Sequence, residues 1–476
     1  MFQPNDSRID QIPSAPSPAA IAELGALLSG RVVLPGERGY DECKSGFEQS
    51  VVHRPALIVA AENTGDLVAS VRFAAEHGLG VAVQATGHGA CVPADENGLL
   101  VNTSGMRRVR VYPKSRIARV EAGACWADVM EAAAEWGLAP LSGAAPGVGA
   151  ISYLLGGGLG LLSRAYGSAC DHVRSFSVIT ADGHVLEVSP RDYPGLFWGL
   201  RGSRGNLGIV ASASISLFPL DEFFGGGLFF DGVHSRTVLD AYTQWTATVP
   251  DTMGSSVCLI RFPAAPGVPD LLRDRFVVHL RVAFIGSEEQ GRALLRPLYS
   301  AAQVLHDTTA PLSYWQSGSI HADPTLPAAT RSRTMTLRSL EQPALDVVER
   351  LAGPEAQAPY MLELRHMGGA LARKAAVPGA IGHYPDAAFS LFTLAHMAPD
   401  GDSAETGRRQ DELITALTPW AAERVLPNFL TGPQSQERLP AAYSPTAYAK
   451  LQALKGVYDP GNMFRYNPNI LPQDQL

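Results

Sequence analysis

The residue with the clearest chemical potential in this sequence is His88, which lies in a glycine-bracketed turn. The turn follows the apolar residues 81–83 and consists of Gln84, Ala85, Thr86, Gly87, His88 and Gly89. Glycines on both sides allow backbone angles and close approaches that a side chain would block, and a strand before the turn would give it a rigid base. The pattern predicts an imidazole that can meet a bound cofactor, with a solvated loop histidine as the alternative.

A second glycine-rich stretch covers residues 142–160. Its candidate binding residues are Gly143, Pro146, Gly147, Val148, Gly149, Ser152, Gly157, Gly158 and Gly160. Dense glycines let successive backbone N–H groups point into one concavity, which suits a pyrophosphate or the pyrimidine edge of a flavin. A nicotinamide dinucleotide fingerprint fails, because its third glycine would fall on Leu161 or Ser163 and no clear strand leads into the run. A purely structural turn stays open as the alternative.

Two further glycine-containing elements follow along the chain. The first, at 198–210, contains the candidate binding residues Asn206, Gly208, Ile209 and Val210, and the second, at 458–470, contains Tyr466, Asn467 and Asn469. In their order, the four elements resemble those of FAD-linked oxidases of the vanillyl-alcohol-oxidase superfamily, and more closely those of its berberine-bridge-enzyme-like branch. The resemblance covers residues 54–469.

This resemblance implies FAD as the cofactor and suggests roles for individual residues. His88 corresponds to the family's histidine that is joined covalently to the flavin ring methyl. Ala145 stands where many members have a cysteine that forms a second flavin bond, so a single histidyl link is implied. Gln84 replaces the family's usual arginine before the turn. Residues 205–210 correspond to the element along the adenine and ribose, and 466–469 to the C-terminal return to the flavin.

Three residues are candidates for the group that removes the substrate proton. Alternation in 360–369 puts Glu363 and Arg365 on one strand face, which the family directs at the flavin; a plain ion pair between them is the alternative. Tyr443 matches a tyrosine that several relatives hold near the flavin, where a neighbouring cation would have to lower its pKa. Tyr153 is the third candidate, with packing as its alternative role. Three other histidines are expected to be structural: His366, His383 and His396.

The pattern of elements and the resemblance together predict a mixed α+β fold. We expect a two-lobed flavoprotein whose discontinuous FAD-binding domain, formed by 1–218 and 425–476, surrounds a substrate domain of antiparallel sheet and helices at 219–424. The first part predicts helices over 64–78 and 126–136 and strands over 118–122, 176–180, 184–188 and 208–217, the last half-buried. The second part predicts strands over 275–285 and 387–396, a helix from 287 to about 305, and loops at 311–327 and 433–445.

The composition narrows the possible classes of protein. The 476 residues are 46% hydrophobic and 18% charged, with a formal net charge of −8, which is typical of a globular protein and argues against nucleic acid as a partner. No segment approaches roughly 18 uninterrupted apolar residues, and the N-terminus lacks a signal-peptide pattern, so we expect no membrane span and a cytoplasmic location. The five cysteines lack C-x-x-C spacing, so neither a metal site nor a disulfide framework is expected.

The expected function is two-electron oxidation of a small, largely apolar product of specialised metabolism, such as antibiotic biosynthesis, with molecular oxygen reoxidising the flavin. The apolar character rests on phenylalanines of the expected substrate domain: Phe223, Phe224, Phe229, Phe230, Phe389 and Phe392. A flavin-dependent dehydrogenase and a redox-inactive flavin-binding protein remain alternatives. The sequence names neither the substrate nor the oligomeric state.

Overall fold

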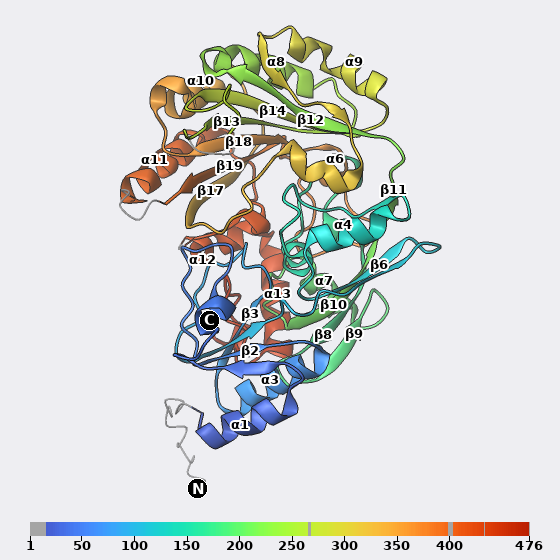
Figure 1. Ribbon diagram of the computed structural model, residues 1–476, viewed down its shortest axis with the longest axis vertical. Coiled ribbons are helices and arrows are strands. Elements are labelled where there is room, and N and C mark those ends of the chain that lie inside the picture. Colours follow the sequence, from blue (N-terminus) through green and yellow to red (C-terminus); the bar gives the residue numbers. More distant parts are fainter. Residues whose placement is uncertain (1–15, 265–267, 398–402, 433, 476) are drawn as a thin grey trace.

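The two lobes of the chain lie one above the other along its long axis (Figure 1). The computed structural model describes residues 16–264, 268–397, 403–432 and 434–475. Within these residues, the first lobe contains three separate sheets and the second contains one large sheet with helices on one face. This two-lobed, mixed α+β architecture confirms the predicted fold class.

The first lobe is formed mainly by the first 219 residues and by the C-terminal segment. Its helices are α1 Pro18–Leu27, α2 Tyr40–Lys44, α3 Thr64–Glu76, α4 Trp126–Ala134, α5 Ala150–Leu155, α6 Ser163–Tyr166, α7 Pro194–Leu200, α12 Ser435–Arg438 and α13 Pro445–Tyr458. Its strands are β1 Arg31–Val33, β2 Leu57–Ala60, β3 Gly80–Gln84, β4 Gly98–Asn102, β5 Val109–Tyr112, β6 Ile117–Glu121, β7 Leu138–Ala139, β8 Val173–Ile179, β9 Val185–Val188, β10 Ile209–Ser216 and β11 Phe218–Pro219.

A four-stranded sheet positions the His88 turn. Its order is β1-β2-β4-β3, with β2, β4 and β3 parallel. Helix α3 packs on it through buried Leu67 and Val71, and its first turn is capped by Asn63, whose side chain accepts a hydrogen bond from the Asp66 N–H. The helix and the strand that enters the turn agree with the sequence expectation. Gln84 is therefore the last residue of β3, and the turn begins directly after it.

The five-stranded antiparallel sheet of the first lobe has the order β5-β6-β10-β8-β9. Strands β8 and β9 form the expected hairpin, with Gly183 at a φ of +75° in its turn. Strand β10 differs from expectation, because it is buried on both faces rather than half-buried. Ala211 packs with the α3 cluster, while the adjacent Val210, on the opposite face, packs with the larger core of the lobe. The alternating serines of β10 therefore lie between two layers and not at a solvent face.

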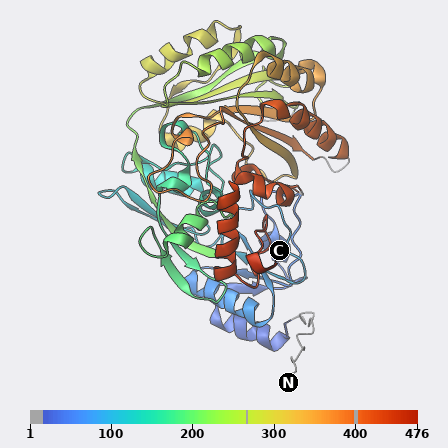
Figure 2. The same cartoon turned by 180° about the vertical axis from the view of Figure 1, so that it is seen from behind.

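The second lobe is one eight-stranded antiparallel sheet covered by helices. Its strands are β12 Phe223–Asp231, β13 Met253–Arg261, β14 Phe276–Ile285, β15 Val304–Asp307, β16 Ala310–Pro311, β17 Thr330–Leu337, β18 Met361–His366 and β19 Phe389–His396, and its helices are α8 Ser235–Thr246, α9 Glu288–Tyr299, α10 Gln342–Ala352 and α11 Ser403–Ala416. All four helices pack on the face directed away from the first lobe (Figures 1 and 2). The opposite face of the sheet is turned toward the first lobe (Figure 1).

Two boundaries in the second half differ from the sequence expectation. Helix α9 begins with the expected capping box of Ser287 and Gln290 but ends at Tyr299, because the chain must be free to form β15 from Val304, which pairs with β12. The segment 433–445, expected to be a loop, contains α12 and a 3-10 turn at Leu439–Ala442 before α13 begins. Proline-rich composition fits the first turn of a helix as well as a loop, which explains the second difference.

The C-terminal segment returns to the first lobe and is held there by a buried ion pair. The ammonium group of Lys455 contacts the Asp459 carboxylate at 2.6 Å, and both side chains are fully buried. Asp459 also accepts hydrogen bonds from the backbone N–H groups of Met463 and Phe464, and the Val81 N–H of β3 donates to the Met463 carbonyl at 2.8 Å. The return is therefore fixed against the strand that precedes the His88 turn.

Among the described residues, no helical segment combines the length and the apolar character that a membrane-spanning helix needs. No group of three or more histidine, cysteine, aspartate or glutamate side chains there is arranged to hold a metal ion.

Candidate active site

A cavity of about 460 Å³ lies between the two lobes and is large enough for a substantial ligand. Thirteen of the predicted cofactor residues line it: Gln84, Ala85, Gly87, His88, Gly89, Gly143, Val148, Ser152, Gly208, Ile209, Val210, Tyr466 and Asn467. The second lobe contributes residues that include Arg281, His321, Asp323, Met361, Glu363, Arg365, Phe392, Leu394 and His396. All four glycine-containing sequence elements contribute residues to this cavity, while their other predicted residues lie outside its lining.

The His88 turn has the backbone that its glycines predict. Gly87 has a φ of +74°, and a Cβ at this position would lie 2.5 Å from the Gly46 Cα. No side-chain-bearing residue would fit there without moving the neighbouring chain. The close approach brings Phe47 onto His88, with the two rings stacked 3.9 Å apart at an interplanar angle of 11°. The glycine therefore allows the aromatic neighbour that fixes the plane of the imidazole.

Thr86 holds one nitrogen of the same imidazole. Its hydroxyl lies 2.8 Å from His88 Nδ1 and also accepts a hydrogen bond from the Gly149 N–H at 3.2 Å. Burial lowers the pKa of His88 to about 4, so the ring is neutral at neutral pH and one of its nitrogens keeps a free lone pair. When Thr86 accepts the proton of Nδ1, that lone pair is on Nε2. A stacked, oriented and neutral imidazole is suited to forming a bond to an electrophilic carbon.

Several polar atoms of the cavity wall have no hydrogen-bond partner among the described residues. They are Gln84 Oε1, His53 Nε2, Tyr153 Oη and Asn467 Oδ1, all on residues that line the cavity. A buried polar atom left unsatisfied costs about 1–3 kcal/mol, which favours a polar ligand in this cavity, although the His53 and Gln84 side chains also interact with each other. These polar atoms come from separate parts of the first lobe, which suits an extended cofactor with polar groups at several points, as FAD has. The donor set of this cavity therefore fits the flavin that the resemblance implies.

Other predicted cofactor residues lie behind the cavity wall. A Cβ on Gly157 would lie 2.7 Å from Ile381, one on Gly158 would lie 2.4 Å from the Tyr153 ring, and one on Gly160 would lie 1.9 Å from the Ser142 carbonyl. These three glycines make room for close packing of protein on protein. Pro146, Gly147 and Gly149 also do not belong to the lining, although a Gly147 Cβ would lie 3.9 Å from His88 and Gly149 donates to Thr86.

The two predicted asparagines outside the lining act on the C-terminal return. Asn206 is fully buried, donates hydrogen bonds to the carbonyls of Ser203 and Pro468, and accepts one from the Ile470 N–H at 2.8 Å. The Asn469 N–H donates to the Gln436 side chain at 2.6 Å. These bonds fix the segment that brings Tyr466 and Asn467 to the cavity.

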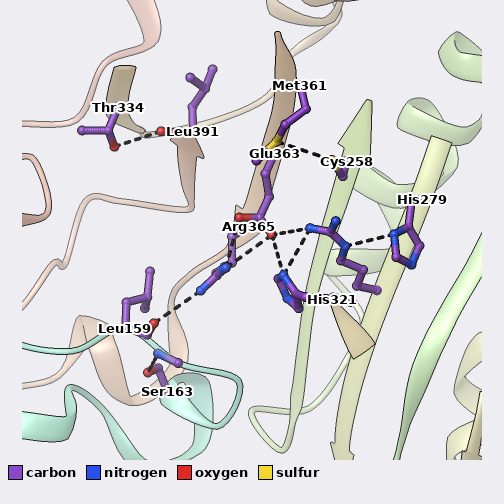
Figure 3. A network of polar contacts seen from close by, with 12 residues as sticks. Leu159, Ser163, Cys258, His279, His321, Thr334, Met361, Glu363, Arg365 and Leu391 are labelled. Carbon is purple, nitrogen blue, oxygen red and sulfur yellow. Dashed lines mark hydrogen bonds and ion pairs between the residues drawn. The ribbon is translucent and has the colours of Figure 1, made fainter. Parts of the chain in front are cut away.

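The second-lobe wall of the cavity carries a buried network of charges (Figure 3). Glu363 on β18 is paired with Arg365 at 3.0 Å and with Arg281 on β14 at 3.2 Å. Burial alone would raise the pKa of Glu363, but the positive charges of Arg365 and Arg281 hold it well below its usual range. The predicted ion pair between Glu363 and Arg365 is present, and the carboxylate has a second cation as well. A carboxylate held in this way accepts a proton poorly.

Two histidines complete this network as neutral rings. Arg281 donates from Nε to His279 Nδ1 at 3.1 Å, and its Nη1 lies 3.2 Å from His321 Nδ1. Because a guanidinium can only donate, both histidines accept at Nδ1 and carry their proton on Nε2. Burial and the Arg281 charge lower the pKa of each ring well below its usual value. His279 stacks on Phe229, whereas His321 lines the cavity.

The structure does not bring Tyr443 to the cavity. Its hydroxyl donates a hydrogen bond to the Gly202 carbonyl at 2.6 Å, and its ring packs in the core of the first lobe. Burial raises its pKa far above the usual tyrosine value, whereas a catalytic base would need a lowered one. Tyr153 does line the cavity, with its ring edge-on to Trp126 and its pKa also raised by burial. Of the two phenols, Tyr153 alone belongs to the cavity lining.

The remaining histidines differ from one another. His366 is structural as expected, because its Nε2 lies 2.8 Å from an Arg164 guanidinium nitrogen and burial lowers its pKa to about 3. His383 lies outside the cavity lining. His396 was expected to be structural but lies exposed at the end of β19 among the lining residues.

Comparisons with known proteins agree with this geometry. Residues 55–189 match the family model described as "FAD binding domain", and residues 428–471 match "Berberine and berberine like". The second match covers the C-terminal return. The chain thus carries the two domains that these models describe, and its relatives include FAD-linked oxidases and berberine-bridge-enzyme-like proteins. It is therefore an FAD-dependent oxidoreductase.

Individual relatives match this chain over nearly its full length. (R)-6-hydroxynicotine oxidase of Paenarthrobacter nicotinovorans is 26% identical over 468 residues, which is 94% of this chain and 97% of the relative. Chitooligosaccharide oxidase of Gibberella zeae is 23% identical and covers 92% of each chain. The solved structure of 6-hydroxy-D-nicotine oxidase from Arthrobacter nicotinovorans matches with a TM-score of 0.80 at 24% identity, covering 94% of this chain and 98% of that one. The structural match shows a shared fold.

Sequence reasoning missed several residues of this site. Phe47 comes from a loop after α2 that carries no recognisable motif, and it reaches His88 only because its N–H donates to the Thr86 carbonyl at 2.9 Å. His321 follows a 3-10 turn and likewise has no local pattern. Arg281 had a usable pattern, since His279 and Arg281 are two polar residues at strand spacing within the apolar strand 276–285. Polar residues on one face of an otherwise buried strand indicate a polar site.

The phenylalanine expectation is largely wrong. Of the six, Phe392 alone lines the cavity. Five belong instead to hydrophobic clusters: Phe223, Phe224, Phe229, Phe230 and Phe389. Phe389 and Phe392 are three residues apart on β19, which places them on opposite faces of the sheet.

Proposed function

We propose that this chain is an oxidase whose FAD is attached by a single covalent link to His88 and which oxidises a small, largely apolar substrate. The observation that carries the proposal is the state of His88. The ring is neutral, stacked on Phe47 and oriented by Thr86. It lies at the wall of a cavity in which several polar atoms have no hydrogen-bond partner among the described residues. Bound FAD would supply two-electron acceptance from the substrate, with molecular oxygen as the final acceptor.

The cofactor would be held mainly by the first lobe. Gln84, Tyr153 and Asn467 offer polar atoms, and the turn glycines allow the backbone to come close. Ala145 lines the cavity at the position where family members with two flavin bonds have a cysteine, which supports a single link. We further propose that 1–218 and 425–476 act together as the FAD-binding domain and 219–424 as the substrate domain, because the Lys455–Asp459 pair and Asn206 fasten the C-terminal return to the first lobe.

The substrate would lie between the cofactor and the second lobe. There, Met361, Phe392 and Leu394 give the cavity an apolar strip. The names of the relatives point to two substrate types, a hydroxylated nicotine and a chitooligosaccharide. A strip of thioether, aromatic and aliphatic side chains favours a ring system over an oligosaccharide. We therefore propose an apolar or aromatic metabolite as the substrate.

Acid precipitation tests the attachment. The purified holoprotein is expected to be yellow and to keep its flavin in the acid pellet, whereas His88→Ala should release all flavin to the supernatant. His184→Ala is the matched control, because His184 is an exposed histidine of the hairpin turn. Flavin in the supernatant of the unmodified protein would contradict the covalent link. Peroxide release during turnover would distinguish an oxidase from the dehydrogenase and from a redox-inactive binder.

A further inference from the structure

The positively charged side chains that line the cavity outnumber the negatively charged ones. Arg281, which is buried, and Arg365, which is half-buried, share the buried carboxylate of Glu363. The other acidic residue of the lining, Asp323, also interacts with Arg281, and desolvation raises its pKa. The first lobe adds a further lining cation, Arg204. The three arginines and two carboxylates of the lining therefore leave an excess of one positive charge.

Arg281 has donor capacity that the protein does not use. Its Nε and Nη1 atoms bind His279, His321 and Glu363, and the guanidinium also interacts with the Cys258 thiol, which is a weak acceptor. Arg365 is more fully engaged, since it donates to both oxygens of Glu363 and to the Leu159 carbonyl. Of the two arginines of this wall, Arg281 thus has the larger unused capacity to donate hydrogen bonds to a ligand.

His321 adds a second donor beside Arg281. Because Arg281 donates to its Nδ1, the neutral ring has its proton on Nε2, and this atom has no acceptor among the described residues. His321 lines the cavity. Its Nδ1 lone pair is occupied, so the ring offers a donor and no acceptor. The nearby carboxylate of Glu363 is already engaged by both arginines.

A donor-rich, cationic wall of this kind recognises an anionic oxygen. The apolar strip of Met361, Phe392 and Leu394 lines the same cavity. We infer that this cavity selects substrates in which an apolar or aromatic body carries an anionic oxygen, a carboxylate or a phenolate, that docks on Arg281 and His321. The inference rests on the proposed function in taking the second-lobe side of the cavity as the substrate site. On this account the wall binds and orients the substrate, and it does not supply a strong base.

Titration calorimetry on the holoprotein tests this inference with simple probes. Benzoate is expected to bind at least about tenfold more tightly than benzamide, because the two have the same shape and differ in charge, and a hydrogen bond to a charged group is worth more than a neutral one. Phenolate and phenol, compared at pH values on either side of the phenol pKa, separate the two anion types. Equal affinity for benzoate and benzamide would overturn the inference.

Two variants locate the effect. Arg281→Gln should weaken benzoate binding about tenfold or more and leave benzamide unchanged, and His321→Phe should weaken benzoate by a smaller factor. Arg110→Gln is the matched control, because it removes one arginine from the exposed side of β5, away from the cavity. Unchanged benzoate binding in both cavity variants would place the anion elsewhere and overturn the inference, even where benzoate is preferred. If Arg281→Gln fails to fold, His321→Phe and the probe pair still decide.

The same measurements separate this inference from the proposed function. Calorimetry reports binding whether or not the substrate is oxidised, and acid precipitation reports flavin attachment whether or not benzoate binds. A yellow pellet with no preference for benzoate would leave the flavin proposal standing and overturn the anion site. Preference for benzoate in a protein that releases its flavin would support the anion site and contradict the covalent flavin link.

Discussion

The two walls of the central cavity differ in the charge state of their ionisable groups. At the first-lobe wall, burial keeps His88 neutral, and its neighbours are an aromatic ring and a hydroxyl group. At the second-lobe wall, Glu363 and Arg281 are also buried, but they and the half-buried Arg365 remain ionised because they are paired. A neutral, oriented ring is suited to forming a bond, whereas paired charges are suited to holding a polar group in place. The comparison teaches that burial alone does not determine charge; the partners do.

The largest expected effect comes from removing the shared carboxylate of the second-lobe wall. Glu363→Gln removes the carboxylate that the buried Arg281 and the half-buried Arg365 share, and should lower the free energy of unfolding by about 3 kcal/mol or more. Urea denaturation of the holoprotein measures this change, with the exposed Glu131→Gln on α4 as the control. Flavin retention should be unaffected in variant protein that folds. A loss below about 1 kcal/mol would mean that these charges are solvated and that the two walls do not differ as described.

A pair of glycine variants probes the first-lobe wall. Gly87→Ala places a Cβ against the Gly46 backbone at a φ of +74°, a strain of about 1–3 kcal/mol, and should reduce covalent flavin incorporation about tenfold or more. Gly89→Ala is the matched control, because a Cβ there meets nothing within 4 Å. The flavin-to-protein absorbance ratio of acid-precipitated, unfolded protein measures incorporation. Equal incorporation in both variants would show that the shape of the turn does not control attachment.

The sequence predicts the two walls unequally well, because one is formed by consecutive residues and the other by residues that are far apart in the chain. The His88 turn is a contiguous run after one strand, so its glycines and histidine can be recognised in a window of six residues. The second wall joins β14, β18 and the residue after a 3-10 turn, and Arg281 lies 82 positions from Glu363. Alternation identified Glu363 and Arg365 as neighbours on one face, but it could not reveal which other strand supplies the second cation.

The glycine-rich stretch shows a different limit. Gly143 lines the cavity, while Gly158 and Gly160 accommodate Tyr153 and the Ser142 carbonyl. A glycine permits close approach by a ligand or by another part of the protein, and sequence does not distinguish the two. The same limit applies to Phe389 and Phe392, since alternation assigns them to opposite faces without saying which face is the cavity.

A smaller effect is expected from the hydroxyl that orients His88. Thr86→Val keeps the shape of the side chain and removes the hydrogen bond to Nδ1, which is worth about 1 kcal/mol, so the initial rate of covalent attachment should fall about fivefold. Thr86→Ser keeps the hydroxyl and should behave like the unmodified protein. Reconstitution of the apoprotein with FAD, sampled over time, gives the rates. A Thr86→Val rate equal to that of Thr86→Ser would assign the orientation of the ring to Phe47 alone.

The pH dependence of attachment gives the smallest and most discriminating change. A buried histidine with a pKa of about 4 stays neutral on acidification until the pH nears 4. The attachment rate should therefore be nearly constant from pH 8 to pH 5.5 and fall below that. An imidazole with the ordinary pKa of about 6.5 would lose about tenfold in rate at pH 5.5. Such a loss, in apoprotein that stays folded, would mean that the first-lobe wall does not keep His88 neutral.

Peptide mapping of the flavin tests the central claim most directly. The holoprotein is digested after acid unfolding, and mass spectrometry locates the added mass of FAD or its phosphodiester cleavage product. The account predicts one flavin per chain, on the peptide that contains His88 and on no other, with the modification absent from His88→Ala. A flavin on any other residue, or none on a peptide of the yellow holoprotein, would contradict it.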